Sequence, residues 1–226
     1  MVTALILAGG IGTRLGADIP KQYIEVNDKP IISYCIDVFV HHNNIDNIQI
    51  VADKSWHEYI SQYISTNKFK GFSVPGENRQ LSIYNGLCDI QKYSADSDIV
   101  IIHDAARPNV SAKMITECIS AAQAHDGAIP VLPMKDTVYL SENGSTISSL
   151  IPREKLFAGQ APEAFKLGKY IAANERLMPN EIKKINGSTE PAIMYNMDIA
   201  MIKGDENNFK ITTPADLERF KEMVIK

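Results

Sequence analysis

The chain has 226 residues, of which 45% are hydrophobic and 22% charged, and its formal net charge is -4. This size and composition fit one α/β domain with a buried core, and the acidic balance argues against a general nucleic-acid binder. No run approaches the length of a membrane span, and the short apolar start lacks a basic leader. We therefore expect a cytoplasmic protein with neither nucleic-acid nor membrane partners.

Strand-like and helix-like segments alternate along the chain. Short apolar runs predict buried strands, and apolar residues at helical spacing predict helices. Strands are expected at 4–8, 48–52, 99–102, 128–132 and 209–212, and helices at 31–39, 80–91, 114–124 and from 214 onward. The alternation predicts one domain over 1–226 with a three-layer α/β/α fold and a mainly parallel, twisted sheet. Ligands of such sheets bind beyond the carboxyl ends of the strands.

Two local features refine this fold prediction. The last helix has Thr213 at its N-cap position, Pro214 at its first position and Asp216 near the capping-box position. Residues 135–157 are polar and hold Gly144 between two β-like runs, which predicts a hairpin arm that protrudes from the core.

The three cysteines, Cys35, Cys88 and Cys118, lie far apart, each in a helix-like segment. Their spacing suits neither a zinc site nor a disulfide framework. We interpret them as buried free thiols.

A glycine-rich loop follows the first strand. Gly9, Gly10 and Gly12 allow the backbone to approach a ligand closely and to point N–H groups at phosphate oxygens. Arg14 and Lys21 add two cations, and an arginine can bind phosphate through two parallel hydrogen bonds. The embedded cations favour a triphosphate as the ligand.

Three other interpretations of this loop compete with a triphosphate site. A P-loop needs Gly-Lys-Ser/Thr at its end, which is absent. A dinucleotide-binding fold needs a third glycine where Leu15 stands and an acidic residue earlier than Asp53, so an NAD(P) oxidoreductase is disfavoured. The third is a plain glycine turn with surface cations, and the combination of the loop with the following Pro-Lys-Gln favours a phosphate site over it.

The run LAGGIGTRLG at 7–16, followed by PKQY at 20–23, resembles the signature of nucleotidyltransferases that activate sugar and polyol phosphates. The short gap between the two motifs is similar to that of the methylerythritol-phosphate and ribitol-phosphate cytidylyltransferases. The resemblance implies a nucleotidyltransferase fold and Mg²⁺-dependent transfer of CMP from CTP to a polyol phosphate. It implies nucleotide contacts from Leu7, Ala8, Gly9, Gly10, Gly12 and Thr13, and catalytic cations at Arg14 and Lys21.

A second segment, PGENRQLS at 75–82, opens a predicted helix. Helical spacing places Arg79 and Ser82 on one face of the first turn, where backbone N–H groups favour an anion or a base carbonyl. The segment resembles the family's Gly-Gly-x-x-Arg-x-x-Ser, which implies nucleotide contacts from Gly76, Glu77, Arg79 and Ser82. Proline stands in place of the first glycine, and taken alone the segment is also typical of an ordinary helix start.

Asp104 follows the buried strand at 99–102. Mg²⁺ prefers one or two carboxylates together with phosphate oxygens and water, so a carboxylate at this strand end predicts a metal ligand. The segment HDAARP is similar to a family motif, which implies that Ala105 and Arg107 lie near the acceptor. The alternative is a structural Asp–Arg pair. His103 is expected to pack in the core.

Three further assignments follow from the resemblance. Thr137 and Arg153 bracket the hairpin, and the family likeness implies that they reach the acceptor phosphate of a partner subunit in a homodimer formed through the 135–157 arm. Lys210 alternates with apolar neighbours on the predicted strand at 209–212 and is expected to be a third cation on the phosphates. Without the resemblance, Thr137 and Arg153 would be interpreted as solvated hairpin residues and Lys210 as a surface lysine.

The chain departs from the family pattern in two segments. Residues 159–163 read GQAPE where the family usually has Gln-Thr-Pro-Gln, and residues 187–192 replace a Thr-Asp-rich loop in which Thr189 is the candidate acceptor contact. The Leu-Ala-Gly-Gly start is closer to the ribitol-phosphate enzymes, so a ribitol 5-phosphate-like acceptor is favoured over methylerythritol phosphate. A non-catalytic nucleotide sensor is the alternative from another class.

Overall fold

The computed structural model describes residues 1–10 and 19–224. The main sheet consists of β1 (Val2–Leu7), β4 (Asn47–Val51), β5 (Phe69–Ser73), β6 (Ile99–Asp104), β7 (Gly127–Pro133), β10 (Phe157–Gly159), β11 (Glu163–Lys166) and β12 (Ile199–Lys203). Two small sheets pair β2 (Glu25–Val26) with β3 (Lys29–Pro30) and β8 (Val138–Leu140) with β9 (Ser149–Ile151). The α-helices are α1 (Ile31–His41), α2 (His57–Ser61), α3 (Arg79–Ile90), α4 (Ala112–Ala124), α5 (Leu167–Glu175), α6 (Glu190–Met194) and α7 (Pro214–Val224).

The main sheet is mostly parallel, as the sequence predicted. Its strand order is β10-β7-β11-β6-β1-β4-β5, and β12 pairs with β7. The pairs β1–β4, β1–β6, β4–β5 and β12–β7 are parallel. The strands β10 and β11, which the sequence did not predict, are antiparallel to their neighbours. This arrangement brings the carboxyl ends of β1 and β6 side by side.

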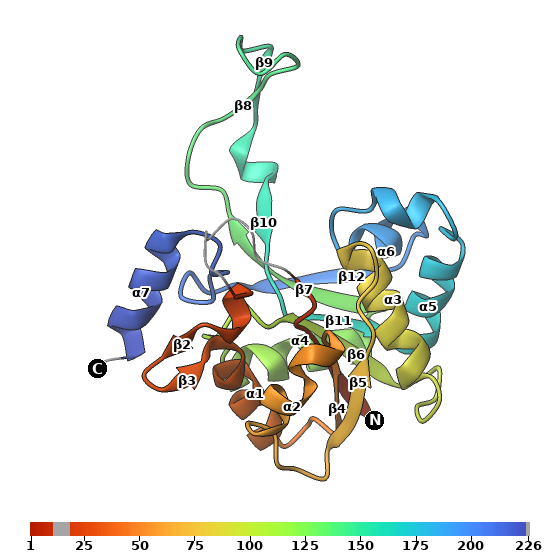
Figure 1. Ribbon diagram of the computed structural model, residues 1–226. Helices are drawn as coiled ribbons and strands as arrows, with labels where there is room; N and C mark the ends of the chain where they lie inside the picture. The colour runs from red at the N-terminus through yellow and green to blue at the C-terminus, as the bar shows by residue number, and fades with distance from the viewer. Residues whose placement is uncertain (11–18, 225–226) are drawn as a thin grey trace.

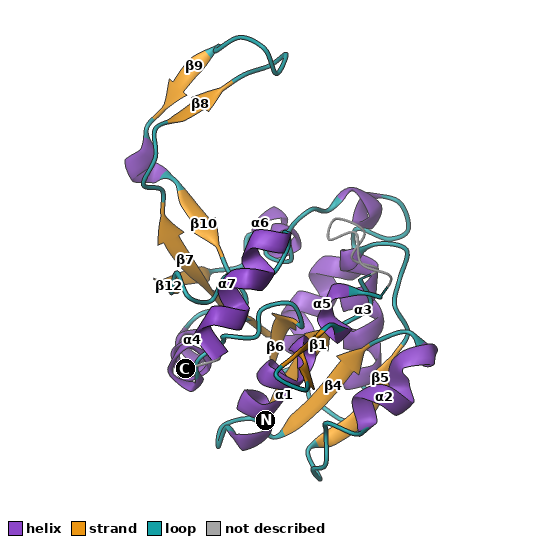
Figure 2. Cartoon of the chain, turned by 60° about the vertical axis from the view of Figure 1, so that its left-hand side comes forward, coloured by secondary structure: helices purple, strands orange, loops and turns teal. Residues whose placement is uncertain are grey.

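Helices cover both faces of the sheet, which confirms the three layers (Figures 1 and 2). Side chains alternate across β1, so that Ala4 and Ile6 pack with α1 and α4 on one face, while Leu5 packs with α3 and α5 on the other. Both faces of β1 are buried, which is why the strand is apolar apart from Thr3. None of the helices in the described ranges is long and apolar enough to cross a membrane.

The hairpin at 135–157, called the arm from here on, stands away from the core (Figure 1). β8 and β9 form an antiparallel ladder from Val138–Ile151 to Leu140–Ser149, with a tight tip that contains Gly144 at a φ of 72°. Only a residue without a Cβ adopts that φ readily. β7 leads into the arm, and β10 returns from it to pair with β7.

One predicted strand does not form. Residues 209–212 are irregular, because the segment makes a single ladder-like bond, from Ile211 N to Ala106 O at 2.9 Å, instead of pairing along its length. The alternation still sets the side-chain directions. Ile211 is buried and Phe209 partly buried against α7, while Lys210 faces the other way, toward Asp104.

The cap of α7 and the cysteines largely agree with the sequence predictions. The Asp216 carboxylate accepts from the backbone N–H of Thr213 at 2.8 Å, and the Thr213 hydroxyl accepts from Asp216 N–H at 3.2 Å, which completes a capping box. The three cysteines are free, and burial raises the pKa of the Cys35 thiol to about 12. Cys118 is buried as well, but Cys88 is only half-buried, which corrects that part of the prediction.

Candidate active site

A cavity of about 400 Å³ opens beyond the carboxyl ends of β1 and β6, where Leu7 and Asp104 are register partners. Ten of the predicted site residues line it: Leu7, Gly9, Gly10, Lys21, Gly76, Glu77, Arg79, Ser82, Asp104 and Lys210. Gln22, Asn78 and Ala106 complete the lining. The predicted residues Gly12, Thr13 and Arg14 lie outside the described residues. The strand topology thus brings the described start of the predicted glycine loop, the helix start and the charged residues Lys21, Asp104 and Lys210 to one place.

The residues that follow Lys21 hold the glycine loop in shape. Gln22 donates from Nε2 to the carbonyl oxygens of Ala8 at 2.6 Å and Gly10 at 2.7 Å, and the Tyr23 hydroxyl donates to the same Ala8 oxygen at 2.9 Å. Both side chains are buried. Sequence reasoning missed this role, although the two residues lie inside the Pro-Lys-Gln-Tyr motif. The motif therefore supplies the cation and also the brace for the loop.

Close packing explains why glycines stand beside the cavity. A Cβ on Gly9 would lie 2.8 Å from side-chain atoms of Pro75, and one on Gly76 would lie 2.4 Å from the Cβ of Leu81. Neither distance is compatible with a side chain. The glycine loop and the segment before α3 thus touch across the mouth of the cavity.

The start of α3 is organised by its own polar side chains. Asn78 caps the helix by accepting from Leu81 N–H at 2.8 Å. The Ser82 hydroxyl accepts from Gly76 N–H at 2.9 Å and donates to Asn78 O at 2.8 Å, so it braces the turn. Glu77 lies at the exposed rim, paired with Lys183 at 2.9 Å.

Asp104 lies among three cations. Arg79 donates to Oδ1 from Nε at 3.2 Å and Nη2 at 3.0 Å, Lys210 Nζ lies 3.0 Å from Oδ2, and Arg107 Nε lies 3.7 Å from Oδ2. Burial alone would raise the pKa of Asp104, but the charges of Arg79, Lys210 and Arg107 outweigh it and hold the pKa well below its ordinary value. The carboxylate is therefore ionised at any physiological pH.

Lys21 lies next to the segment that carries Lys210. Its Nζ donates to the backbone oxygen of Ile211 at 2.6 Å. Among the described residues, the cavity has two lysines and Arg79 around one buried carboxylate, with Glu77 at the rim. This excess of positive charge suits a polyphosphate.

Arg107 and His103 lie outside the cavity lining, and each is fixed by a hydrogen bond to a backbone oxygen. Arg107 donates from Nη1 to the backbone oxygen of Asn208 at 2.6 Å. His103 is fully buried, and its Nε2 donates to the backbone oxygen of Arg107 at 2.9 Å. Burial lowers the pKa of His103 to about 4, so the ring is neutral at pH 7. The core position predicted for His103 is confirmed.

None of the five predicted acceptor-side residues lines the cavity, and Arg107, described above, is one of them. Ala105 is buried, and it is Ala106 that reaches the lining. Thr137 and Arg153 are exposed on the arm, where Arg153 donates to Lys135 O at 2.8 Å. The Thr189 hydroxyl donates to Glu163 at 2.6 Å instead of facing the cavity. The acceptor side is thus less complete than the nucleotide side within the described part of one chain.

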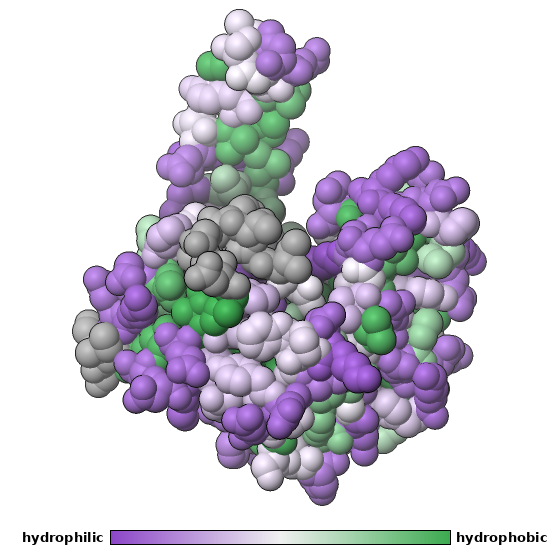
Figure 3. Space-filling model, in the orientation of Figure 1, coloured by the Kyte–Doolittle hydropathy of each residue, from purple (hydrophilic) through white to green (hydrophobic). Residues whose placement is uncertain are grey.

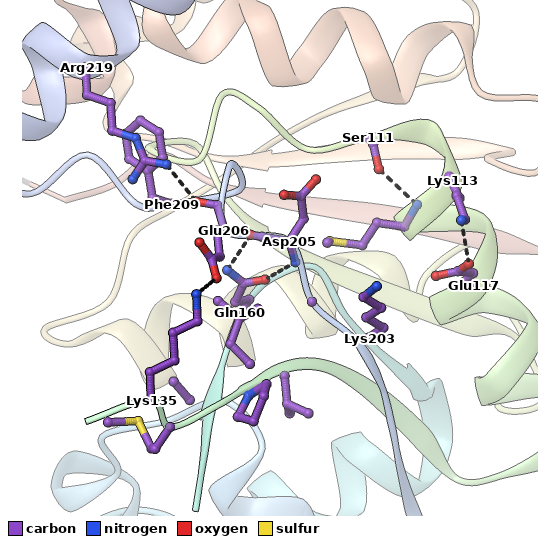
Figure 4. A pocket seen from close by; sticks show the side chains of 17 residues that line it. Ser111, Lys113, Glu117, Lys135, Gln160, Lys203, Asp205, Glu206, Phe209 and Arg219 are labelled. Carbon is purple, nitrogen blue, oxygen red and sulfur yellow. Dashed lines mark hydrogen bonds and ion pairs between the residues drawn. The ribbon is translucent and has the colours of Figure 1, made fainter. Parts of the chain in front are cut away.

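A larger cavity of about 970 Å³ lies between α4, β7, β12 and α7 (Figure 4). Its polar side chains pair with one another: Lys135 with Glu206, Gln160 with the backbone of Asp205, and Lys113 with Glu117. It contains none of the predicted site residues. The smaller cavity is therefore the candidate active site.

A glycine-rich segment after the first strand, cations that line the same cavity and a carboxylate at the end of β6 are the features of an α/β nucleotidyltransferase. The family model described as IspD, 2-C-methyl-D-erythritol 4-phosphate cytidylyltransferase, matches residues 2–226, and the chain belongs to this family of CTP-dependent cytidylyltransferases.

Relatives with two different names are similar to this chain over nearly its full length. A ribitol-5-phosphate cytidylyltransferase of Streptococcus agalactiae serotype III (strain NEM316) is 31% identical and covers 99% of this chain and 95% of its own. A ribitol-5-phosphate cytidylyltransferase of Vibrio parahaemolyticus is 32% identical, and the match covers 99% of this chain and 96% of that relative. A 2-C-methyl-D-erythritol 4-phosphate cytidylyltransferase of Syntrophotalea carbinolica is 36% identical, with 96% and 93% covered.

Solved structures support the same fold. The 2-C-methyl-D-erythritol 4-phosphate cytidylyltransferase of Francisella tularensis is 26% identical, with a TM-score of 0.82 and 98% of both chains covered. The 4-diphosphocytidyl-2C-methyl-D-erythritol synthase of Anaerococcus prevotii DSM 20548 has a TM-score of 0.85 at 22% identity, with 100% of this chain and 96% of that chain covered.

Proposed function

We propose that this chain transfers CMP from CTP to ribitol 5-phosphate, releasing pyrophosphate and forming a CDP-polyol in the cytoplasm. The observation that carries the transfer chemistry is the meeting of Lys21, Arg79, Asp104 and Lys210 at one cavity beyond the glycine loop. A nucleotide sensor would need the loop but not a buried carboxylate held by cations, so the enzyme is favoured over the sensor.

The chain's own residues supply binding, alignment and charge. An acceptor phosphate oxygen attacks the α-phosphorus in line, and no side-chain nucleophile is needed because this phosphate is already anionic. Lys21 and Lys210 neutralise charge that grows on the departing pyrophosphate, which is the main contribution expected of a protein in phosphoryl-type transfer. The α3 start, with Arg79 and Ser82, takes the cytidine.

The donor groups at the cavity fit a magnesium ion. No cluster of three or more His, Cys, Asp or Glu side chains occurs in residues 1–10 and 19–224, so a metal here would depend on Asp104 together with substrate phosphate oxygens and water. That is the set Mg²⁺ prefers beside a nucleotide. When bound, Mg²⁺ would supply charge neutralisation on the phosphates, and Asp104 would have to exchange its contact with Lys210 or Arg79 for the metal.

Two acceptors remain as candidates. The Leu-Ala-Gly-Gly start of the loop and the ribitol-named relatives, which cover 98–99% of this chain, support ribitol 5-phosphate. The family description and the relative that is 36% identical support 2-C-methyl-D-erythritol 4-phosphate as the second candidate.

A pyrophosphate-release assay tests the function. CTP, UTP and ATP are each combined with ribitol 5-phosphate, methylerythritol 4-phosphate and other polyol phosphates, with Mg²⁺ present. We expect turnover with CTP and ribitol 5-phosphate, with a kcat/KM at least about tenfold above that for any other pair. Turnover with methylerythritol phosphate alone would favour the second candidate. CTP binding without pyrophosphate release from any acceptor would favour the sensor.

The arm supports a proposed homodimer. Five large apolar side chains on or beside it are exposed: Tyr139, Leu140, Ile147, Leu150 and Phe157. Figure 3 shows hydrophobic residues along one side of the arm. An isolated two-stranded hairpin is marginally stable, and an apolar face of this kind marks an interaction surface. We infer that two copies pair through their arms, and that Thr137 and Arg153 complete the acceptor site of the partner.

Mixing two inactive variants tests the shared site. Lys21→Ala removes a cation from a chain's own cavity, and Arg153→Ala removes the proposed contact to the partner's cavity. If the sites are shared, heterodimers have one intact site, and a re-equilibrated equal mixture should recover about a quarter of wild-type turnover. Sedimentation equilibrium of each variant confirms the dimer. No recovery on mixing, with dimers intact, would contradict the shared site.

A further inference from the structure

A buried carboxylate behind the candidate site has no part in the proposed chemistry. Glu163, the first residue of β11, is 7% exposed, and its two oxygens accept hydrogen bonds from the hydroxyls of Ser188 at 2.5 Å and Thr189 at 2.6 Å. Glu163 belongs to one segment that departs from the family pattern, and its two partners belong to the other. The two departures therefore meet at one carboxylate.

Burying this group is costly. Burial raises the pKa of Glu163, against the opposing charge of Arg79 and the hydrogen bonds from Ser188 and Thr189. A neutral glutamine has the same shape and would carry a smaller desolvation penalty. A carboxyl group kept at this buried position, one hydroxyl away from Arg79, therefore points to a use beyond packing.

Ser188 lies between Arg79 and Glu163 and connects them by two hydrogen bonds that run in one direction. Ser188 is 2% exposed, and its Oγ accepts from Arg79 Nη1 at 2.8 Å. The hydroxyl proton of Ser188 is directed to Glu163 Oε1, and the Ser188 lone pairs face Arg79. Arg79 in turn can only donate. The order Arg79 to Ser188 to Glu163 is thus fixed by the chemistry of the three groups.

The other edge of the same guanidinium contacts Asp104. Arg79 donates to Asp104 from Nε and Nη2, while Nη1 faces Ser188. Burial alone would lower the pKa of Arg79, but the charges of Asp104 and Glu163 raise it above its ordinary value. The guanidinium is therefore held between one carboxylate in direct contact and a second carboxylate relayed by Ser188.

We propose that Glu163 is a positioning residue that holds Arg79, through Ser188, in the orientation in which it meets the nucleotide. The inference rests on the proposed function, in which Arg79 belongs to the CTP site. Asp104 holds the guanidinium through Nε and Nη2, and Glu163 holds Nη1 through Ser188, so the group is fixed at both of its edges. A side chain fixed in its binding orientation loses less freedom when the ligand arrives, which raises affinity.

Calorimetric titration with CTP and Mg²⁺, without an acceptor, tests this in the absence of turnover. Glu163→Gln keeps the shape, removes the charge and introduces an amide donor that competes with the Ser188 proton. We expect the Kd for CTP to rise about tenfold, which corresponds to about 1.4 kcal/mol. Ser188→Ala interrupts the same path, so the double variant should bind no more weakly than Glu163→Gln alone.

Tyr170→Phe is the matched control. The Tyr170 hydroxyl donates to the backbone oxygen of Ser188 at 2.6 Å and accepts from Gln80 Nε2 at 3.0 Å. This variant therefore loses two buried hydrogen bonds beside the path from Arg79 while the side chains of the path stay unchanged. Its Kd for CTP should stay within about twofold of wild type. Circular dichroism melts establish that each variant folds.

The outcomes separate this inference from the proposed function. Wild-type affinity in Glu163→Gln, or equal losses in Tyr170→Phe and Ser188→Ala, would overturn the positioning role and leave the proposed function intact. A wild-type protein that fails to bind CTP would overturn the proposed function, and the positioning role with it.

Discussion

Replacing Lys21 by alanine is expected to lower kcat for CMP transfer by on the order of 10²- to 10³-fold while the protein stays folded. The Lys21 ammonium lines the cavity and donates to Ile211 O at 2.6 Å, which fixes it beside the segment that carries Lys210. A cation fixed in place before the reaction stabilises charge that develops on the pyrophosphate more effectively than solvent can. Its loss should therefore appear mainly in kcat, and less in the KM for CTP.

The measurement is steady-state pyrophosphate release together with thermal unfolding. Lys54→Ala is a suitable control, because Lys54 is exposed on a short turn and does not line the cavity. The control should retain wild-type turnover. If folded Lys21→Ala turned over at a rate within about tenfold of the control, Lys21 would have no catalytic role of the proposed size.

The sequence was sufficient to predict the central strands and the residues at their ends. The strands β1 and β6 are buried on both faces, so each contains a continuous apolar run, which ends before Gly9 in the first case and before His103 and Asp104 in the second. Because parallel strands bring their carboxyl ends to the same edge, the loop and the carboxylate had to lie close together. The position of the nucleotide side of the site thus follows from local patterns.

Other elements could not be read from local patterns. β11 is four residues long and antiparallel to β6, and it runs directly into α5 without a turn signal. The segment around Lys210 alternates like a strand, yet it is held mainly by side chains and one backbone bond to Ala106, which no periodicity reveals. Alternation of apolar and polar residues predicts which way each side chain points. It does not predict whether the backbone pairs with a neighbouring strand.

The contacts of Arg79 show the same limit at the site. Its place at the start of α3 was predictable from helical spacing, but its partners Asp104, Ser188 and Glu163 come from distant parts of the chain. The sequence shows that the segments 159–163 and 187–192 both depart from the family pattern. It does not show that they are joined by a hydrogen bond between Ser188 and Glu163. Pairings of this kind depend on the tertiary fold, and a single sequence carries no separate signal for them.

Asp104→Asn should abolish metal-dependent turnover, with kcat reduced by about 10³-fold or more, because a metal ion supplies several kcal/mol of charge stabilisation. The amide keeps the shape of the carboxylate but lacks the charge that Mg²⁺ requires. Arg79 and Lys210 lose their shared anion and become available to the phosphates. Without metal, CTP should therefore bind this variant at least as tightly as it binds wild type.

Titrating CTP with and without Mg²⁺ separates this metal role from a structural one. A metal ligand predicts that Mg²⁺ strengthens CTP binding to wild type and no longer does so in Asp104→Asn, whereas a structural Asp–Arg pair predicts weaker binding under both conditions. Acid stability gives an independent check. The pKa of Asp104 is depressed in the folded state, so its stabilisation is fully present above about pH 4 and is lost as the pH falls further. The variant should lack that part of the acid dependence, and an unchanged response to Mg²⁺ in the variant would remove Asp104 from the metal site.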